Sequence, residues 1–116
     1  MAVLRPFEAI RPREDIVHQV AALPYDVMSS EEAKEMVKDN PYSFLHVDKA
    51  EIDLEPSIDL YDKKVYEKAR DNLNKMIDDG VYIKDNQPCL YIYKLIMDER
   101  EQIGIVGCAS IDEYQD

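Results

Sequence analysis

Glycine and cysteine are scarce in this chain, and their scarcity removes several classes of site. The 116 residues include only three glycines and two cysteines. The glycines form neither a Walker phosphate loop nor a dinucleotide-binding pattern. Cys89 and Cys108 lie in apolar, strand-like runs, which predicts buried free thiols. No histidine, cysteine or carboxylate set has metal-ligand spacing, so no metal site is predicted.

Long apolar runs are also missing. No stretch approaches the roughly 18 apolar residues that a membrane-spanning helix needs. The first residues meet a proline at position 6 and carry no apolar run of the signal-peptide type. We therefore expect a cytoplasmic protein with reduced thiols and no membrane contact.

Positive charge is in deficit. The chain has 14 basic and 25 acidic residues, a net charge of −11, and residues 51–116 hold 16 of the acidic ones. Wide contact with nucleic acid requires clustered lysine and arginine. We therefore expect no direct nucleic-acid contact from this segment, although a small local anion site stays compatible with the charge.

The apolar pattern predicts an α+β fold. Helices are expected near 13–22, 29–39 and 63–79, the second starting at a capping box from Ser29 to Glu32 and the third closed by Gly80. Residues 48–60 are acidic and without periodicity, which predicts a loop. A short strand or extended segment is expected at 2–10. Strands are expected at 43–47, 81–83, 89–97 and 102–110, and the last two predict a 89–110 β-hairpin at the centre of a mixed sheet.

Both strands of the expected hairpin are apolar on both faces, which is typical of a sheet covered on both sides. The expected helices do not suffice to cover it. We therefore expect a single domain over 1–116 that is the N-terminal fragment of a longer protein. An exposed sheet edge left by truncation could also make the chain a homodimer for reasons unrelated to its biological role.

Two Pro-Tyr segments, residues 23–27 and 40–47, carry the candidate ligand-binding and catalytic side chains. Proline stiffens each bend and presents a tyrosine. Tyr25, Tyr42 and Ser43 are candidates for ligand binding, and Asp26 is an acid–base candidate. The alternative is structural: packing for the tyrosines, and turn hydrogen bonds for Ser43 and Asp26.

His46 and two arginines complete the candidate set. In a strand, His46 points opposite to Leu45 and Val47, toward a polar face or a cleft, which makes it the second catalytic candidate. Arg5 and Arg11 belong to the only basic cluster and could clamp a phosphate or carboxylate. Solvated arginines and a structural histidine are the alternatives.

Several segments together resemble the start of the bacterial domain-of-unknown-function family 1015. The resemblance rests on Arg5-Pro6-Phe7, on residues 21–27 and 40–47, on Tyr66-Glu67-Lys68-Ala69-Arg70 and on residues 104–110. It implies an uncharacterised protein whose relatives are longer. More distantly, the order of helix, Gly80, strand and hairpin resembles the ParB/SpoOJ and sulfiredoxin-like fold, which implies nucleotide binding.

Three functions stay open at this point. The first is a nucleotide-dependent small-molecule enzyme, perhaps one of phosphoryl transfer, that uses ATP or CTP with magnesium and has its main motif beyond residue 116. The second is a ParB/SpoOJ-like chromosome-partitioning or regulatory protein. The third is a non-catalytic interaction module, because fold analogy does not fix function.

Overall fold

The structure, a computed structural model, describes residues 3–113. The chain divides into two compact units, which we describe separately. Unit 1 comprises the described residues up to Arg11 and from Lys84 onward, and unit 2 is Pro12–Ile83. The division falls within two short strands, β2 (Ile10–Pro12) and β3 (Tyr82–Lys84), which form a two-stranded sheet.

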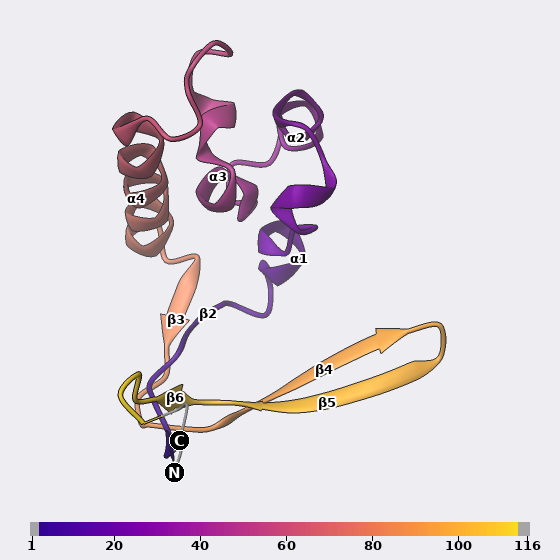
Figure 1. The fold of residues 1–116 in the computed structure, drawn as a ribbon, viewed down its shortest axis with the longest axis vertical. Helices are drawn as coiled ribbons and strands as arrows, with labels where there is room; N and C mark the ends of the chain where they lie inside the picture. The colour runs from indigo at the N-terminus through magenta and orange to yellow at the C-terminus, as the bar shows by residue number, and fades with distance from the viewer. Residues whose placement is uncertain (1–2, 114–116) are drawn as a thin grey trace. The chain divides into compact units, whose positions relative to one another are not determined.

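Unit 2 is helical (Figure 1). Its elements in chain order are α1 (Val17–Val20), the 3-10 turn η1 (Tyr25–Val27), α2 (Ser30–Met36), α3 (Leu45–Asp48), the 3-10 turn η2 (Ala50–Asp53) and α4 (Lys63–Asp78). The core consists of two apolar clusters. The first joins Ile16, Val20, Met76 and Val81, and the second joins Ala33, Val37, Leu45 and Ile52.

The segment at 43–47 is a helical turn, so the strand expected there is wrong. The Ser43 hydroxyl accepts a hydrogen bond from the Leu45 amide at 3.3 Å and starts α3. Phe44 and Val47 pack against the first cluster, whereas Leu45 belongs to the second. Three-residue spacing puts Phe44 and Val47 on one side of a helical turn. A strand would instead direct Leu45 and Val47 to the same face, so packing between two clusters requires the helix.

Local capping signals place the longer helices. The Ser29 side chain accepts a hydrogen bond from the Glu32 amide at 3.1 Å, and the Asp62 side chain accepts from the Lys64 amide at 2.9 Å. Both contacts satisfy amides that have no partner within the helix. The helix expected over 29–39 ends at Met36, and the helix expected over 13–22 is regular only at Val17–Val20. The loop expected at 48–60 contains η2.

Helix α4 ends in a glycine-dependent motif. Gly80 has φ +76°, its amide donates to the Ile77 carbonyl, and the Val81 amide donates to the Met76 carbonyl, both at 3.0 Å. This is the pattern of a Schellman motif. Val81 and Met76 also share the first core cluster, so the motif directs the chain from α4 into the core.

Unit 1 contains the hairpin of β4 (Tyr91–Met97) and β5 (Arg100–Val106), which pair antiparallel from Tyr91↔Val106 to Met97↔Arg100. Two further strands, β1 (Leu4–Arg5) and β6 (Cys108–Ala109), pair antiparallel. An isolated bridge joins Phe7 to Cys89. Cys89 is half-buried and Cys108 is exposed, and both are free.

The α+β class and the hairpin are confirmed. The sheet differs from the expected mixed sheet, because the strands in residues 3–113 form three separate two-stranded sheets. The hairpin turn occupies only residues 98–99 instead of 98–101. In the described part of the chain no helix is both long and apolar enough to cross a membrane. That the chain is a single domain from a longer protein stays a prediction.

Replacing Gly80 by alanine is expected to destabilise unit 2 by about 1 kcal/mol, because L-residues adopt positive φ only at a cost. An added Cβ would meet nothing within 4 Å there, so backbone strain is the only penalty. Urea unfolding followed by circular dichroism at 222 nm measures the change. Gly104→Ala is the control, since its Cβ would also meet no atom and its φ is not positive. Equal stability of both variants would contradict the prediction.

Candidate functional site

The imidazole of His46 lies at the centre of a hydrogen-bonded network in unit 2. Its Nδ1 is 2.8 Å from Oδ2 of Asp53, and its Nε2 is 2.9 Å from the carbonyl oxygen of Asn40. The side chains of His46 and Asp53 are 15% and 27% exposed. A carbonyl oxygen only accepts, so the contact with Asn40 uses a proton on Nε2.

A second polar side chain, from α4, closes this network. The Nδ2 of Asn72 donates to the backbone carbonyl of His46 at 2.7 Å and to Oδ2 of Asp53 at 2.9 Å. The network therefore joins α3, η2 and α4 at one point. It fixes the imidazole in orientation, as a residue that binds a ligand or moves a proton requires.

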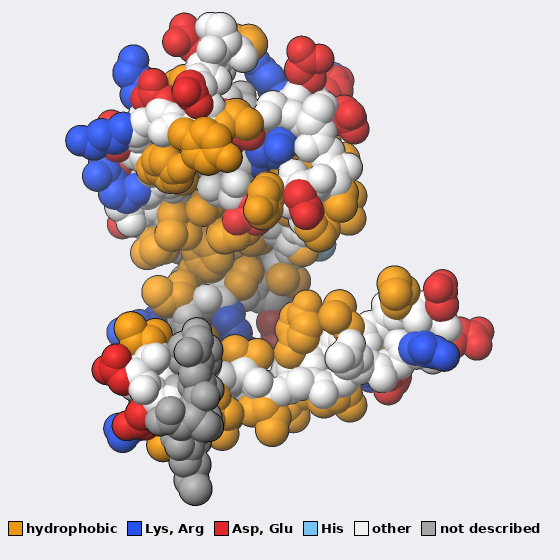
Figure 2. Space-filling model, in the orientation of Figure 1, with side chains coloured by type: hydrophobic (Ala, Val, Ile, Leu, Met, Phe, Trp, Pro, Cys, Tyr) orange, Lys and Arg blue, Asp and Glu red, His pale blue; other side chains and the backbone are white. Residues whose placement is uncertain are grey.

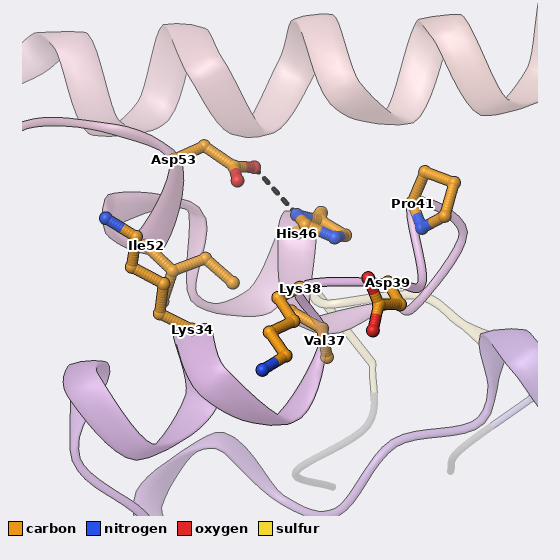
Figure 3. A pocket seen from close by; sticks show the side chains of 8 residues that line it. All are labelled: Lys34, Val37, Lys38, Asp39, Pro41, His46, Ile52 and Asp53. Carbon is orange, nitrogen blue, oxygen red and sulfur yellow. Dashed lines mark hydrogen bonds and ion pairs between the residues drawn. The ribbon is translucent and has the colours of Figure 1, made fainter.

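A hollow of about 550 Å³ lies against the His46–Asp53 pair (Figure 3). Its apolar lining is Val37, Pro41 and Ile52, and its charged lining is Lys34, Lys38, Asp39, His46 and Asp53. Lys34 lies in α2, and Lys38 lies in the turn that follows the end of this helix at Met36. The hollow therefore combines apolar walls with two ammonium groups and a fixed imidazole.

A smaller hollow, of about 190 Å³, also reaches His46 and Asp53. Its other lining residues are Pro41, Tyr42, Asn72, Lys75, Met76 and Asp79. The His46–Asp53 pair thus borders two hollows, one lined from the α2 side and the other from α4.

The structure brings only part of the predicted site together. Tyr42 and His46 line the smaller hollow. Ser43 is only 3% exposed, and its hydroxyl caps α3. Tyr25 and Asp26 lie exposed in η1 and line neither hollow.

The bend at Tyr25 is held from inside the unit. The Nζ of Lys49 donates to the carbonyl of Tyr25 at 3.1 Å and lies 3.6 Å from Oε1 of Glu51. Ser30 donates its hydroxyl proton to the same Glu51 oxygen at 3.0 Å. The side chains of Lys49 and Glu51 are both 11% exposed, so a shielded ion pair fixes the backbone that presents Tyr25.

Arg5 and Arg11 belong to unit 1. Arg5 is an exposed residue of β1, while Arg11 pairs with Oδ1 of Asp85 at 3.0 Å and lies over the Tyr91 ring at 5.2 Å. The Tyr91 hydroxyl donates to the other oxygen of Asp85 and accepts from the Ala9 amide at 2.9 Å. The guanidinium of Arg11 therefore has a carboxylate partner within its own unit.

This cluster shifts three pKa values. Hydrogen bonds from Tyr91 and then Arg11 lower the pKa of Asp85. Burial, followed by the hydrogen bond to Asp85, raises the pKa of Tyr91, and the bond to Asp85 raises the pKa of Arg11. In unit 2, burial raises the pKa of Asp48 and of Tyr82.

Four residues of the site were missed by the sequence analysis: Lys34, Lys38, Asp53 and Asn72. The sequence signal for the two lysines was their four-residue spacing within the helix expected over 29–39. Asp53 was assigned to a solvated acidic loop, and only its contact with His46 distinguishes it from its neighbours. Within residues 3–113 no cluster of three or more His, Cys, Asp or Glu side chains is arranged to hold a metal ion.

Replacing Asn72 by alanine is expected to destabilise unit 2 by about 1–3 kcal/mol, because it removes two hydrogen bonds, one of them to a carboxylate. Asn74→Ala is the matched control, since Asn74 is exposed on the same helix and gains the same helix propensity. The difference between the urea midpoints of the two variants measures how much the network contributes to stability. Indistinguishable midpoints would show that the network contributes nothing to stability.

Asp85 is expected to titrate below the ordinary range of an aspartate, because its folded pKa is depressed. A depressed carboxyl pKa contributes stability above the unfolded pKa, and this contribution disappears as the pH falls through the folded pKa. The carboxyl carbon shift of Asp85 against pH, recorded by NMR, measures it. Tyr91→Phe removes the hydrogen bond that lowers the pKa of Asp85 most and should move the midpoint upward, and an unmoved midpoint would contradict this assignment.

Comparison with known proteins identifies the family of this chain. The family model described as "Protein of unknown function (DUF1015)" matches residues 4–116. No curated protein and no solved structure matches the chain significantly. The match covers nearly the whole sequence, including the elements that form the His46 network. The chain therefore belongs to the family "Protein of unknown function (DUF1015)".

Proposed function

We propose that the larger hollow binds the anionic part of a small molecule, such as the phosphates of a nucleotide, and that the chain serves a nucleotide-dependent small-molecule enzyme. The observation that carries this proposal is that Lys34, Lys38 and His46 line one hollow. The same hollow has an apolar lining of Val37, Pro41 and Ile52. Ligand sites are usually concave and apolar, with a few polar groups that fix orientation.

The charges support an anionic ligand. Lys38, in the turn after α2, forms an exposed pair with Glu35 at 2.7 Å, a contact of small energetic value that a phosphate can replace. Lys34 forms no ion pair among the described residues. Asp53 also lines the hollow, but its Oδ2 already accepts from Asn72 and faces His46. In a chain of net charge −11, the charges that line this hollow are balanced, with two lysines against two carboxylates, Asp39 and Asp53.

His46 remains the acid–base candidate of this proposal. A carboxylate on one ring nitrogen is the arrangement that orients a catalytic imidazole. The other nitrogen faces the Asn40 carbonyl, so proton transfer to a substrate requires that Nε2 exchange this oxygen for a ligand atom. Asp26, on the exposed η1, is the weaker candidate because it does not line the hollow.

Isothermal titration with ATP, CTP and ADP, each with magnesium, and with inorganic pyrophosphate tests the proposal. Lys34→Gln combined with Lys38→Gln is expected to weaken binding about 10- to 100-fold, through the loss of charge-assisted hydrogen bonds. Lys63→Gln combined with Lys64→Gln is the control, because it makes the same change in net charge at exposed positions outside the hollow.

The outcomes distinguish binding of the ligand at the hollow from its attraction to the net charge of the protein. Equal weakening in both double variants would indicate only an effect of net charge and would contradict a site at the hollow. No binding of any of these compounds by the protein would exclude a nucleotide site at this hollow.

A non-catalytic interaction module is the second candidate, and one observation favours it. Residues 21–27 are all exposed, although they include Leu23, Tyr25 and Val27. A contiguous apolar segment on the surface is typical of a protein-binding site. A ParB/SpoOJ-like role has less support, because net charge −11 opposes nucleic-acid contact by this segment.

A further inference from the structure

The β4–β5 hairpin has two unpaired edges. Within residues 3–113 each of these strands pairs only with the other. Ile92, Ile103 and Ile105 are 79%, 64% and 67% exposed, and Figure 2 shows hydrophobic side chains along both sides of the hairpin. A long apolar edge with free backbone groups is a template for another strand.

The register shows which backbone groups are free on each edge. Met97 pairs with Arg100 across a two-residue turn, so this pair exchanges hydrogen bonds and the pairs beyond it alternate. On β5, Glu101, Ile103 and Ile105 therefore direct their N–H and C=O groups away from β4. On β4, Ile92, Lys94 and Ile96 direct theirs away from β5.

The two edges differ in which residues would face each other if a strand paired antiparallel, over its full length, with the same strand of a second copy. The residue at the centre of the strand would then lie opposite itself, at the symmetry axis. Each strand has seven residues, with Lys94 at the centre of β4 and Ile103 at the centre of β5. Pairing of two β4 strands would set Lys94 opposite Lys94, and like charges in that position are destabilising. Pairing of two β5 strands sets Ile103 opposite Ile103, Glu101 opposite Ile105 and Arg100 opposite Val106, with no like-charge pair.

Lys94 and Glu101 lie on one face of the hairpin, and their opposite charges neutralise each other. The Nζ of Lys94 lies 3.2 Å from Oε1 of Glu101. Ile92, Ile96, Ile103 and Ile105 share this face through the pairs Ile92↔Ile105, Lys94↔Ile103 and Ile96↔Glu101. Across the β5 edge, isoleucines from two copies would continue as one apolar surface.

We propose that two copies of this chain join through β5, antiparallel and with Ile103 opposite Ile103, in a four-stranded sheet of order β4-β5-β5-β4. The outward groups of Glu101, Ile103 and Ile105 supply about six hydrogen bonds between the copies. The β4 edges stay unpaired and keep Lys94, a charge of the kind that protects sheet edges. This pairing is independent of the nucleotide proposal.

Sedimentation velocity over a concentration series, without added nucleotide, tests the pairing first. The protein is expected to sediment as a dimer, and amide exchange by NMR should show Glu101, Ile103 and Ile105 protected while Ile92, Lys94 and Ile96 exchange freely. A monomer at all concentrations, or protection of the β4 amides instead, would overturn the proposal.

Proline variants test the edge directly. Ile103→Pro removes an N–H that the hairpin does not use, and proline is tolerated on strand edges. It should raise the dimer dissociation constant at least about tenfold. Lys94→Pro makes the equivalent change on the β4 edge and should leave the dimer intact. Retention of the dimer by Ile103→Pro, or equal loss in both variants, would overturn the assignment to β5.

A second variant covers the case in which proline unfolds the hairpin. Ile103→Lys sets two lysines opposite each other at the axis, which should dissociate the dimer at low salt and less so at high salt. A dimer that is insensitive to this change would also contradict the proposed register.

Discussion

The helical turn α3 is the element on which unit 2 depends, because it lies between the two apolar clusters. Phe44 and Val47 face one cluster while Leu45 completes the other. The Asn72 amide holds the turn from α4 through the backbone carbonyl of His46. Figure 1 shows α3 between α4 and α2, so a change in this turn would reach both clusters and every helix packed on them.

The candidate site is a consequence of that packing. Because α3 is a helical turn and η2 follows at once, Asp53 returns to His46 only seven residues later in the chain. The contacts with Asp53 and with the Asn40 carbonyl orient the ring. Lys34 and Lys38 line the same hollow, because Ala33 in α2 and Val37 at its C-terminal end belong to the core and fix this part of the chain.

Unit 1 is organised around polar contacts and strand pairing. The phenol of Tyr91 binds Asp85 and Ala9, Arg11 covers the ring, and Phe7 packs against it with centroids 5.1 Å apart. The hairpin that extends from this cluster has exposed apolar residues on both faces. Its tight turn places two non-glycine residues, Asp98 and Glu99, at positive φ, a conformation that the strands must stabilise.

The sequence by itself determined the features that depend on contacts within a few residues. The cap at Ser29, the Gly80 terminus and the existence of the hairpin were all predictable, because their hydrogen bonds and apolar periodicity are local. Residues 43–47 were not, since a five-residue segment with apolar side chains at 44, 45 and 47 fits a strand as well as a helical turn. Only tertiary packing chose the helix, and with it the pairing of His46 with Asp53, because that choice depends on two clusters formed by residues far apart in the chain.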